Sequence, residues 1–177
     1  MKFNDIPQFI DDGNYEVNVP LTSLEERITD WIEDPHYKLQ VNPDFQRGHV
    51  WTMEQQVNFV EFFLRGGKTG RVIYFNKPSW HFQATTEYDD FVIVDGLQRL
   101  TALRMFLAGK IKVFGLFIHQ FENSIGRARC RDNLKFNINS LQTRKQVLEW
   151  YLEMNTGGVV HTASEIERVK GLLAKEK

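Results

Sequence analysis

The stretch FVIVDGLQRLTA, residues 91–102, joins an apolar run to a glycine turn. Its first four residues are all apolar, which predicts a short strand covered on both faces, because a strand with one solvated face alternates apolar and polar side chains. Asp95 and Gly96 then turn the chain, and a helix is expected from about Leu97 to Leu107. The sequence therefore predicts a tight glycine turn that leads from a buried strand into a helix.

Two further helices are predicted before this stretch. Each begins with a capping box, in which a threonine and an acidic or amide residue three positions later satisfy the free amides of a helix start. The two boxes are Thr22 with Glu25 and Thr52 with Gln55. The elements expected upstream are a strand over 15–19, a helix from the first box to about residue 33, a turn-rich loop over 34–51, a helix from the second box to Gly66-Gly67, a strand over 72–75 and a polar loop over 76–90.

Strands and helices also alternate downstream. Strands are expected over about 112–118 and 135–138, a helix over about 141–154, and a last helix from a third capping box, Thr162 with Glu165, to the C-terminus. The sequence shows no internal repeat and no linker. It predicts an α+β class and a single domain over 1–177, with an α/β core over about 15–140 and a helical part over 141–177.

Composition and charge exclude several classes of protein. Hydrophobic residues make up 42% of the 177 residues and charged residues 25%, values typical of soluble globular proteins and not of disordered or fibrous ones. The net charge of −1 gives no global attraction to nucleic acid or to an anionic membrane. A local nucleic-acid contact would need a patch such as Arg127, Arg129 and Arg131; alternatively these residues form a solvated loop or an edge strand.

The single cysteine, Cys130, excludes an intramolecular disulfide and a cysteine-rich zinc site, and it favours a reducing compartment. Histidines show no metal-ligand spacing. The N-terminus lacks the apolar core of a secretion signal, and no apolar run reaches the roughly 18 residues of a membrane span. We therefore expect a cytoplasmic protein without a membrane partner.

The turn at Asp95-Gly96 is the first candidate site. Ligands of α/β folds bind beyond the carboxyl ends of strands, and the amides at a helix start favour an anion such as phosphate. Arg99 could neutralise a phosphate and Asp95 could hold a divalent cation or position water, with Gln98 orienting one of these groups. In the alternative interpretation Asp95 only caps the helix and Arg99 is solvated.

Two other loops carry candidate binding residues. In the first, Arg47 could join a phosphate site, with Gln46 adding a planar amide and Trp51 sealing the loop; alternatively Arg47 is a surface residue beside a structural tryptophan. The second loop is Asn155-Thr156-Gly157-Gly158. It is either a helix C-cap or a polar wall that contacts base, sugar or phosphate, and His161 beyond it is either an acid or base, or structural.

Three motifs together resemble a known family. PDFQRGHVW, VIVDGLQRLTAL and YLEMNTGGVVHTASEI, in this order, resemble the N-terminal domain of GmrSD-type restriction endonucleases, also called domain of unknown function 262, from roughly residue 17 to the C-terminus. The resemblance implies a ParB/sulfiredoxin-like fold, with a small mixed sheet flanked by helices. It also implies NTP binding and hydrolysis in defence against foreign or modified DNA.

The family's motifs can be transferred residue by residue. Its Asp-Gly-Gln-Gln-Arg motif corresponds to residues 95–99, with Leu97 in place of the first glutamine. Leucine cannot hydrogen-bond a nucleotide or water, which favours binding over hydrolysis unless this position points into the core. The Pro-Tyr-Gln-Arg segment corresponds to Pro43, Phe45, Gln46 and Arg47, with Asp44 inserted, and the asparagine motif to residues 155–158.

The resemblance thus implies an NTP-binding domain, with a Mg²⁺-dependent NTPase as its catalytic version, that gates a DNA-directed defence, counter-defence or restriction-type activity. Asp95, Gln98 and Arg99 would be catalytic, with Asp95 as the Mg²⁺ ligand. The nucleotide would contact Gln46, Arg47, Gly96, Arg99, Asn155, Thr156, Gly157 and Gly158. Because the chain lacks an HNH nuclease signature, a separate nuclease subunit is an expected partner, in a prokaryotic cell or phage-infected host. The alternatives are a non-catalytic module that binds DNA or protein, as in a phage or mobile-element regulator, and a weak DNA nickase.

Overall fold

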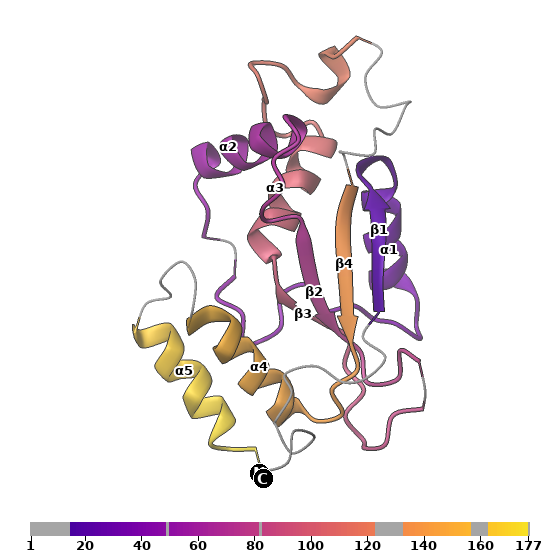
Figure 1. Ribbon diagram of the computed structural model, residues 1–177, viewed down its shortest axis with the longest axis vertical. Helices are drawn as coiled ribbons and strands as arrows, with labels where there is room; N and C mark the ends of the chain where they lie inside the picture. The colour runs from indigo at the N-terminus through magenta and orange to yellow at the C-terminus, as the bar shows by residue number, and fades with distance from the viewer. Residues whose placement is uncertain (1–14, 49, 82, 123–132, 157–162, 177) are drawn as a thin grey trace.

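The computed structural model describes residues 15–48, 50–81, 83–122, 133–156 and 163–176 (Figure 1). Over these residues the chain forms five α-helices and one small mixed sheet of four strands, which confirms the α+β class. The elements in chain order are β1 (Tyr15–Pro20), η2 (Leu21–Ser23), α1 (Leu24–Glu33), α2 (Met53–Leu64), β2 (Val72–Asn76), β3 (Val92–Asp95), α3 (Leu97–Leu107), η3 (Ile118–Gln120), β4 (Asn133–Asn139), α4 (Arg144–Thr156) and α5 (Ala163–Leu173), where η marks a 3-10 helix.

The sheet joins strands that are distant in sequence. Its order is β1-β4-β2-β3, with β1 antiparallel to β4, β2 parallel to β4 and β3 antiparallel to β2. Phe136 of β4 lies opposite Val17 of β1 and Ile73 of β2. The register between β2 and β3 shifts next to Tyr74, which lies opposite Asp95 at the C-terminal end of β3. This irregularity is adjacent to the turn that the sequence singles out.

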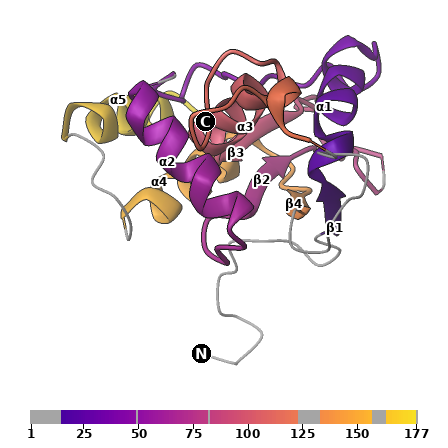
Figure 2. The ribbon, with the colours of Figure 1, turned by 90° about the horizontal axis from the view of Figure 1, so that it is seen from above.

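Helices cover β3 on both sides, as the apolar run predicts. Ile93 packs in one hydrophobic cluster with residues of α1, α2 and α3, whereas Val92 and Val94 pack in a second cluster with residues of α4 and α5. All three side chains are at most 2% exposed. Figures 1 and 2 both show α4 and α5 beside the edge of the sheet that β3 forms, and α1 beside β1 at the other edge. The pattern of β3 therefore places its C-terminal end between two helical layers.

Two of the three predicted capping boxes lie within the described residues, and of these only the box at Thr52 forms. The Thr52 hydroxyl accepts a hydrogen bond from the Gln55 amide (3.2 Å), and the Gln55 side chain accepts one from the Thr52 amide (2.9 Å). The box expected at Thr22 is wrong, because residues 21–23 form the 3-10 helix η2 and α1 begins only after Ser23. This short helix buries Leu21 against the core, and tertiary packing thereby overrides the local signal.

The strand expected over 112–118 is also wrong. Val113 and Leu116 bridge across a two-residue turn in which Phe114 and Gly115 both have positive φ (51° and 78°), and η3 follows. Ile111 and Val113 are buried in the core cluster, so the chain turns back here instead of extending along the sheet.

The helix expected over 141–154 begins three residues later, at Arg144. Leu141 stays outside it because its amide and carbonyl are hydrogen-bonded to the buried Asn76 side chain (2.8 and 3.0 Å). The third capping box involves Thr162, which lies outside the described residues.

Candidate functional site

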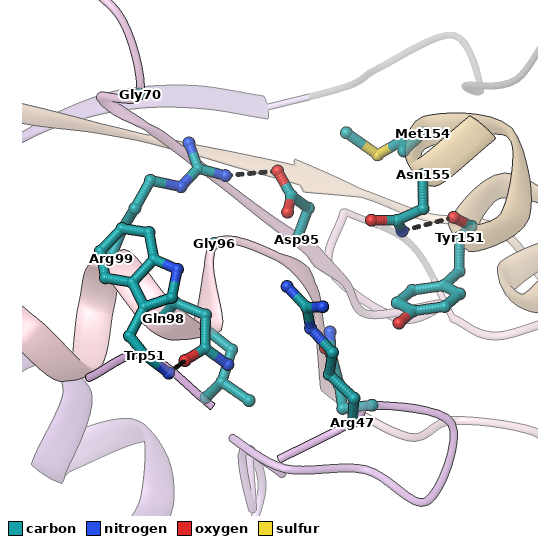
Figure 3. A pocket seen from close by; sticks show the side chains of 12 residues that line it. Arg47, Trp51, Gly70, Asp95, Gly96, Gln98, Arg99, Tyr151, Met154 and Asn155 are labelled. Carbon is teal, nitrogen blue, oxygen red and sulfur yellow. Dashed lines mark hydrogen bonds and ion pairs between the residues drawn. The ribbon is translucent and has the colours of Figure 1, made fainter. Parts of the chain in front are cut away.

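A pocket of about 350 Å³ opens at the C-terminal end of β3 (Figure 3). This volume lies within the range of small-molecule sites. Four segments far apart in sequence form its walls: the loop before α2, the loop before β2, the β3–α3 turn and the last turns of α4. The lining residues are Gln46, Arg47, Trp51, Gly70, Asp95, Gly96, Leu97, Gln98, Arg99, Tyr151, Met154 and Asn155. The structure thus gathers residues of all three predicted loops around one cavity.

Gly96 makes the turn from β3 into α3. Its φ of 102° lies in the left-handed region that favours glycine, and an added Cβ would lie 2.6 Å from Ile73 Cδ1 and 3.3 Å from Ile73 Cα. Gly96 is also the N-cap residue of α3 and has no side chain to cap the helix. The first-turn amides of Leu97 to Arg99, which have no intrahelical acceptor, therefore remain available beside the pocket.

Asp95 and Arg99 form an ion pair within the pocket wall (Figure 3). Arg99 also donates a hydrogen bond from Nη1 to the Val72 carbonyl (2.9 Å), and its side chain is only 18% exposed. The interpretation that Asp95 caps the helix and Arg99 is solvated is therefore wrong. Within the described part of the chain, the second carboxylate oxygen of Asp95 has no hydrogen-bond partner, and it lines the pocket.

Gln98 fixes the loop that enters α2. Its Oε1 accepts hydrogen bonds from the amides of Val50 (2.9 Å) and Trp51 (3.1 Å), and its Nε2 donates one to the Gly48 carbonyl (2.5 Å). Both ends of the amide are thus used on backbone groups. In this conformation Gln98 positions a wall of the pocket, and its amide is not free to orient water.

Gln46 fixes the same loop to the sheet. Its Nε2 donates hydrogen bonds to the carbonyls of Ile93 (3.2 Å) and Val94 (2.9 Å) in β3. The neighbouring Arg47 is consequently held at the mouth of the pocket, and Figure 3 shows its guanidinium directed toward Gly96. The contact of Arg47 within the described residues is an ion pair with Glu165 at 3.8 Å, longer than a hydrogen bond.

Tyr151 and Asn155 form the opposite wall from one face of α4. Burial raises the pKa of the Tyr151 hydroxyl even though nearby Arg47 acts in the opposite direction, so the group stays protonated at neutral pH. Asn155 donates a hydrogen bond from Nδ2 to the Tyr151 carbonyl (2.6 Å). Figure 3 shows its side-chain oxygen on the side that faces Asp95.

Residues 28–139, more than half of the chain, match the family described as the N-terminal domain of the GmrSD restriction endonuclease. The chain belongs to this family. Membership of this family associates the chain with restriction-type, DNA-directed defence. No curated protein and no solved structure matches the chain, so the ParB/sulfiredoxin-like architecture stays a prediction.

In this GmrSD N-terminal domain, part of the predicted site lies beyond the structural description. Thr156 is the last residue of α4, while Gly157, Gly158 and His161 lie outside the described residues, as do Arg127, Arg129, Cys130 and Arg131. Leu97 is 8% exposed and packs in the core cluster, so this departure from the family motif is largely a core residue at the pocket edge.

Sequence reasoning missed several wall residues of the GmrSD domain, among them Gly70, Tyr151 and Met154. Tyr151 could have been predicted from the sequence, because residues four positions apart share one helix face and Asn155 was already a candidate. Among the described residues, no three His, Cys, Asp or Glu side chains are grouped to hold a metal ion. Over the same residues, none of the helices combines the length and apolar character needed to cross a membrane.

Proposed function

We propose that the pocket binds a nucleoside triphosphate, and that binding gates the DNA-directed activity of the restriction system. One observation supports this: Arg47 and the first-turn residues of α3, about 50 residues apart in sequence, line the same cavity, and the start of a helix carries amides without an intrahelical acceptor. A helix N-terminus and an arginine provide the partial and full positive charges that phosphate groups require.

The remaining walls suit the rest of a nucleotide. Trp51 and Met154 offer apolar surface to a base, and the Tyr151 hydroxyl and the Asn155 side-chain oxygen can hydrogen-bond a sugar or base edge. Magnesium binds proteins through one or two carboxylates together with substrate phosphates, and the unpaired oxygen of Asp95 fits that pattern. Asp95 would hold such an ion, which would neutralise phosphate charge.

A second candidate is a nucleotide-dependent binding module without turnover. It is favoured by the engagement of Gln98 with the loop backbone and of Arg99 with Asp95, because both motif side chains are then committed to structural contacts. In this version the nucleotide stabilises one conformation of the domain, which then binds DNA or a nuclease subunit.

Isothermal titration calorimetry with ATP, GTP, CTP and UTP in the presence of Mg²⁺ tests the proposal. Arg47→Ala should weaken binding about ten-fold or more, the loss expected for one charge-assisted hydrogen bond. Arg65→Ala is the matched control, because Arg65 lies at the far end of α2 and its side chain is 70% exposed. Melting temperatures of both variants establish that they fold.

If none of the four nucleotides binds the wild-type chain, the proposed function is wrong. Phosphate release then separates the two candidates for any nucleotide that does bind. Steady release that Asp95→Asn abolishes supports a hydrolase, whereas tight binding with no release supports the binding module.

A further inference from the structure

Helix α5 holds the loop that carries Arg47. The Arg168 guanidinium donates hydrogen bonds to three consecutive backbone carbonyls, those of Asp44 (2.5 Å), Phe45 (2.7 Å) and Gln46 (3.2 Å). A planar guanidinium with several donors suits such a multiple contact. Because these carbonyls immediately precede Arg47, the position of that side chain depends on α5.

The same helix also supplies a carboxylate to Arg47. Glu165 lies three residues before Arg168 on α5, and its Oε2 is 3.8 Å from Arg47 Nη1. Both side chains are less than a quarter exposed, so the attraction between them is screened less than it would be on an open surface. Glu165 therefore places beside Arg47 the kind of negative charge that a phosphate would bring.

We propose that α5 sets the affinity of the pocket for anionic ligands: Arg168 positions the loop that carries Arg47, and Glu165 competes with the ligand for Arg47. This inference rests on the proposed function of the pocket. Arg168 is a positioning residue, since it acts on the ligand only through the loop. Helix α5 lies beyond residues 28–139, so the family match does not assign these two roles.

The two roles predict opposite effects. An anion that binds Arg47 must replace Glu165 or share the guanidinium with it, which costs part of the binding free energy. Removing the charge of Glu165 should therefore tighten binding. Loss of Arg168 instead frees the loop, so that the ligand must order it on binding, and affinity should fall. A purely structural Arg47–Glu165 pair would give weaker or unchanged binding when Glu165 is neutralised.

Calorimetry with MgATP and with sodium tripolyphosphate, on the full chain, measures both effects. Glu165→Gln should tighten binding about five-fold or more, the lower end of typical coupling between sites. Glu167→Gln is its matched control, because Glu167 is 69% exposed on the same helix and pairs with Lys170. Arg168→Gln should weaken binding about five-fold, Arg168→Lys should weaken it less, and Lys170→Gln should leave it unchanged.

Melting temperatures identify any variant that fails to fold. If Arg168→Gln fails to fold, the binding affinity of Glu165→Gln still tests the inference. Unchanged or weaker binding by folded Glu165→Gln, with a wild-type chain that binds, overturns the role of α5 and leaves the proposed function standing. Absence of binding by the wild-type chain with both probes overturns this inference together with the proposed function.

Discussion

Gly96 shows how one residue can define a pocket. The chain must leave β3 and enter α3 within a single residue, which requires the left-handed backbone found there, and the backbone must also pass close to Ile73. The absence of a side chain further leaves the α3 amides uncovered. Backbone conformation, close packing and the uncovered amides of the helix end therefore all depend on this glycine.

Gly96→Ala should lower the free energy of unfolding by about 1–3 kcal/mol from backbone strain, with a further cost from overlap with Ile73. Gly115→Ala separates the cost of backbone strain from the cost of overlap with Ile73. Gly115 also has a positive φ, 78°, but a Cβ there would meet no atom within 4 Å, so only the backbone cost of about 1 kcal/mol is expected. Urea unfolding of both variants measures the difference, and equal losses would contradict a steric role for Ile73.

At the scale of elements, the capping boxes predicted at Thr22 and Thr52 show that equivalent local signals can lead to different structures. Thr52 and Gln55 satisfy each other's amides at the start of α2, close to the pocket residue Trp51. Thr22 lies in a 3-10 helix, where packing of Leu21 determines the path of the chain.

Thr52→Ala should therefore destabilise the protein by about 1 kcal/mol, the usual cost of losing an N-cap side chain. Thr22→Ala, identical in chemistry and in sequence signature, should change stability by less than about 0.5 kcal/mol. Chemical denaturation of the two variants side by side provides the measurement. A loss at Thr22 as large as that at Thr52 would mean that the first box does cap a helix in solution.

At the scale of the whole molecule, an ion pair joins two helices, α1 and α3, that share one hydrophobic cluster. Arg104 of α3 donates two hydrogen bonds to the Glu25 carboxylate of α1, at 2.8 and 2.6 Å. The hydrogen bond from Arg104 is the main cause that holds the pKa of Glu25 below its usual value of 4.5, although partial burial acts in the opposite direction. The folded chain therefore binds a proton at Glu25 less readily than the unfolded chain does.

This shift predicts a pH dependence of stability. The contribution of Glu25 is fully present above about pH 4.5 and is lost as the pH falls through the lowered pKa, because the unfolded chain takes up the proton first. Glu25→Gln should lower the melting temperature at pH 7, and the difference from wild type should shrink toward pH 3. Glu26→Gln, on the neighbouring exposed residue, is the control. A difference that persists at pH 3 would show that the pair acts through packing instead of charge.

Local patterns in the chain were sufficient for much of the fold and for the centre of the candidate site. The apolar run of β3, the Asp95-Gly96 turn and the Thr52 box each depend on neighbours within a few residues, so sequence reasoning could locate them. The segment 112–118 has β-prone residues, but Val113 is buried by residues distant in sequence, and the local pattern therefore predicted a strand that does not form.

The sequence by itself determined which residue types are available at the turn: a glycine that can adopt positive φ, a carboxylate before it and an arginine one helical turn later. The partners of these residues depend on how the chain packs in space. The tertiary structure committed Arg99 to Asp95, and it placed Arg47 beside Glu165 of α5. It also joined the loop before α2 to the β3–α3 region through Gln98, which bonds to the Val50 amide, and through Gln46, which bonds to the Val94 carbonyl. The physical reason is that hydrogen bonds and ion pairs act over a few ångströms in space, and distance along the chain does not fix which groups come that close.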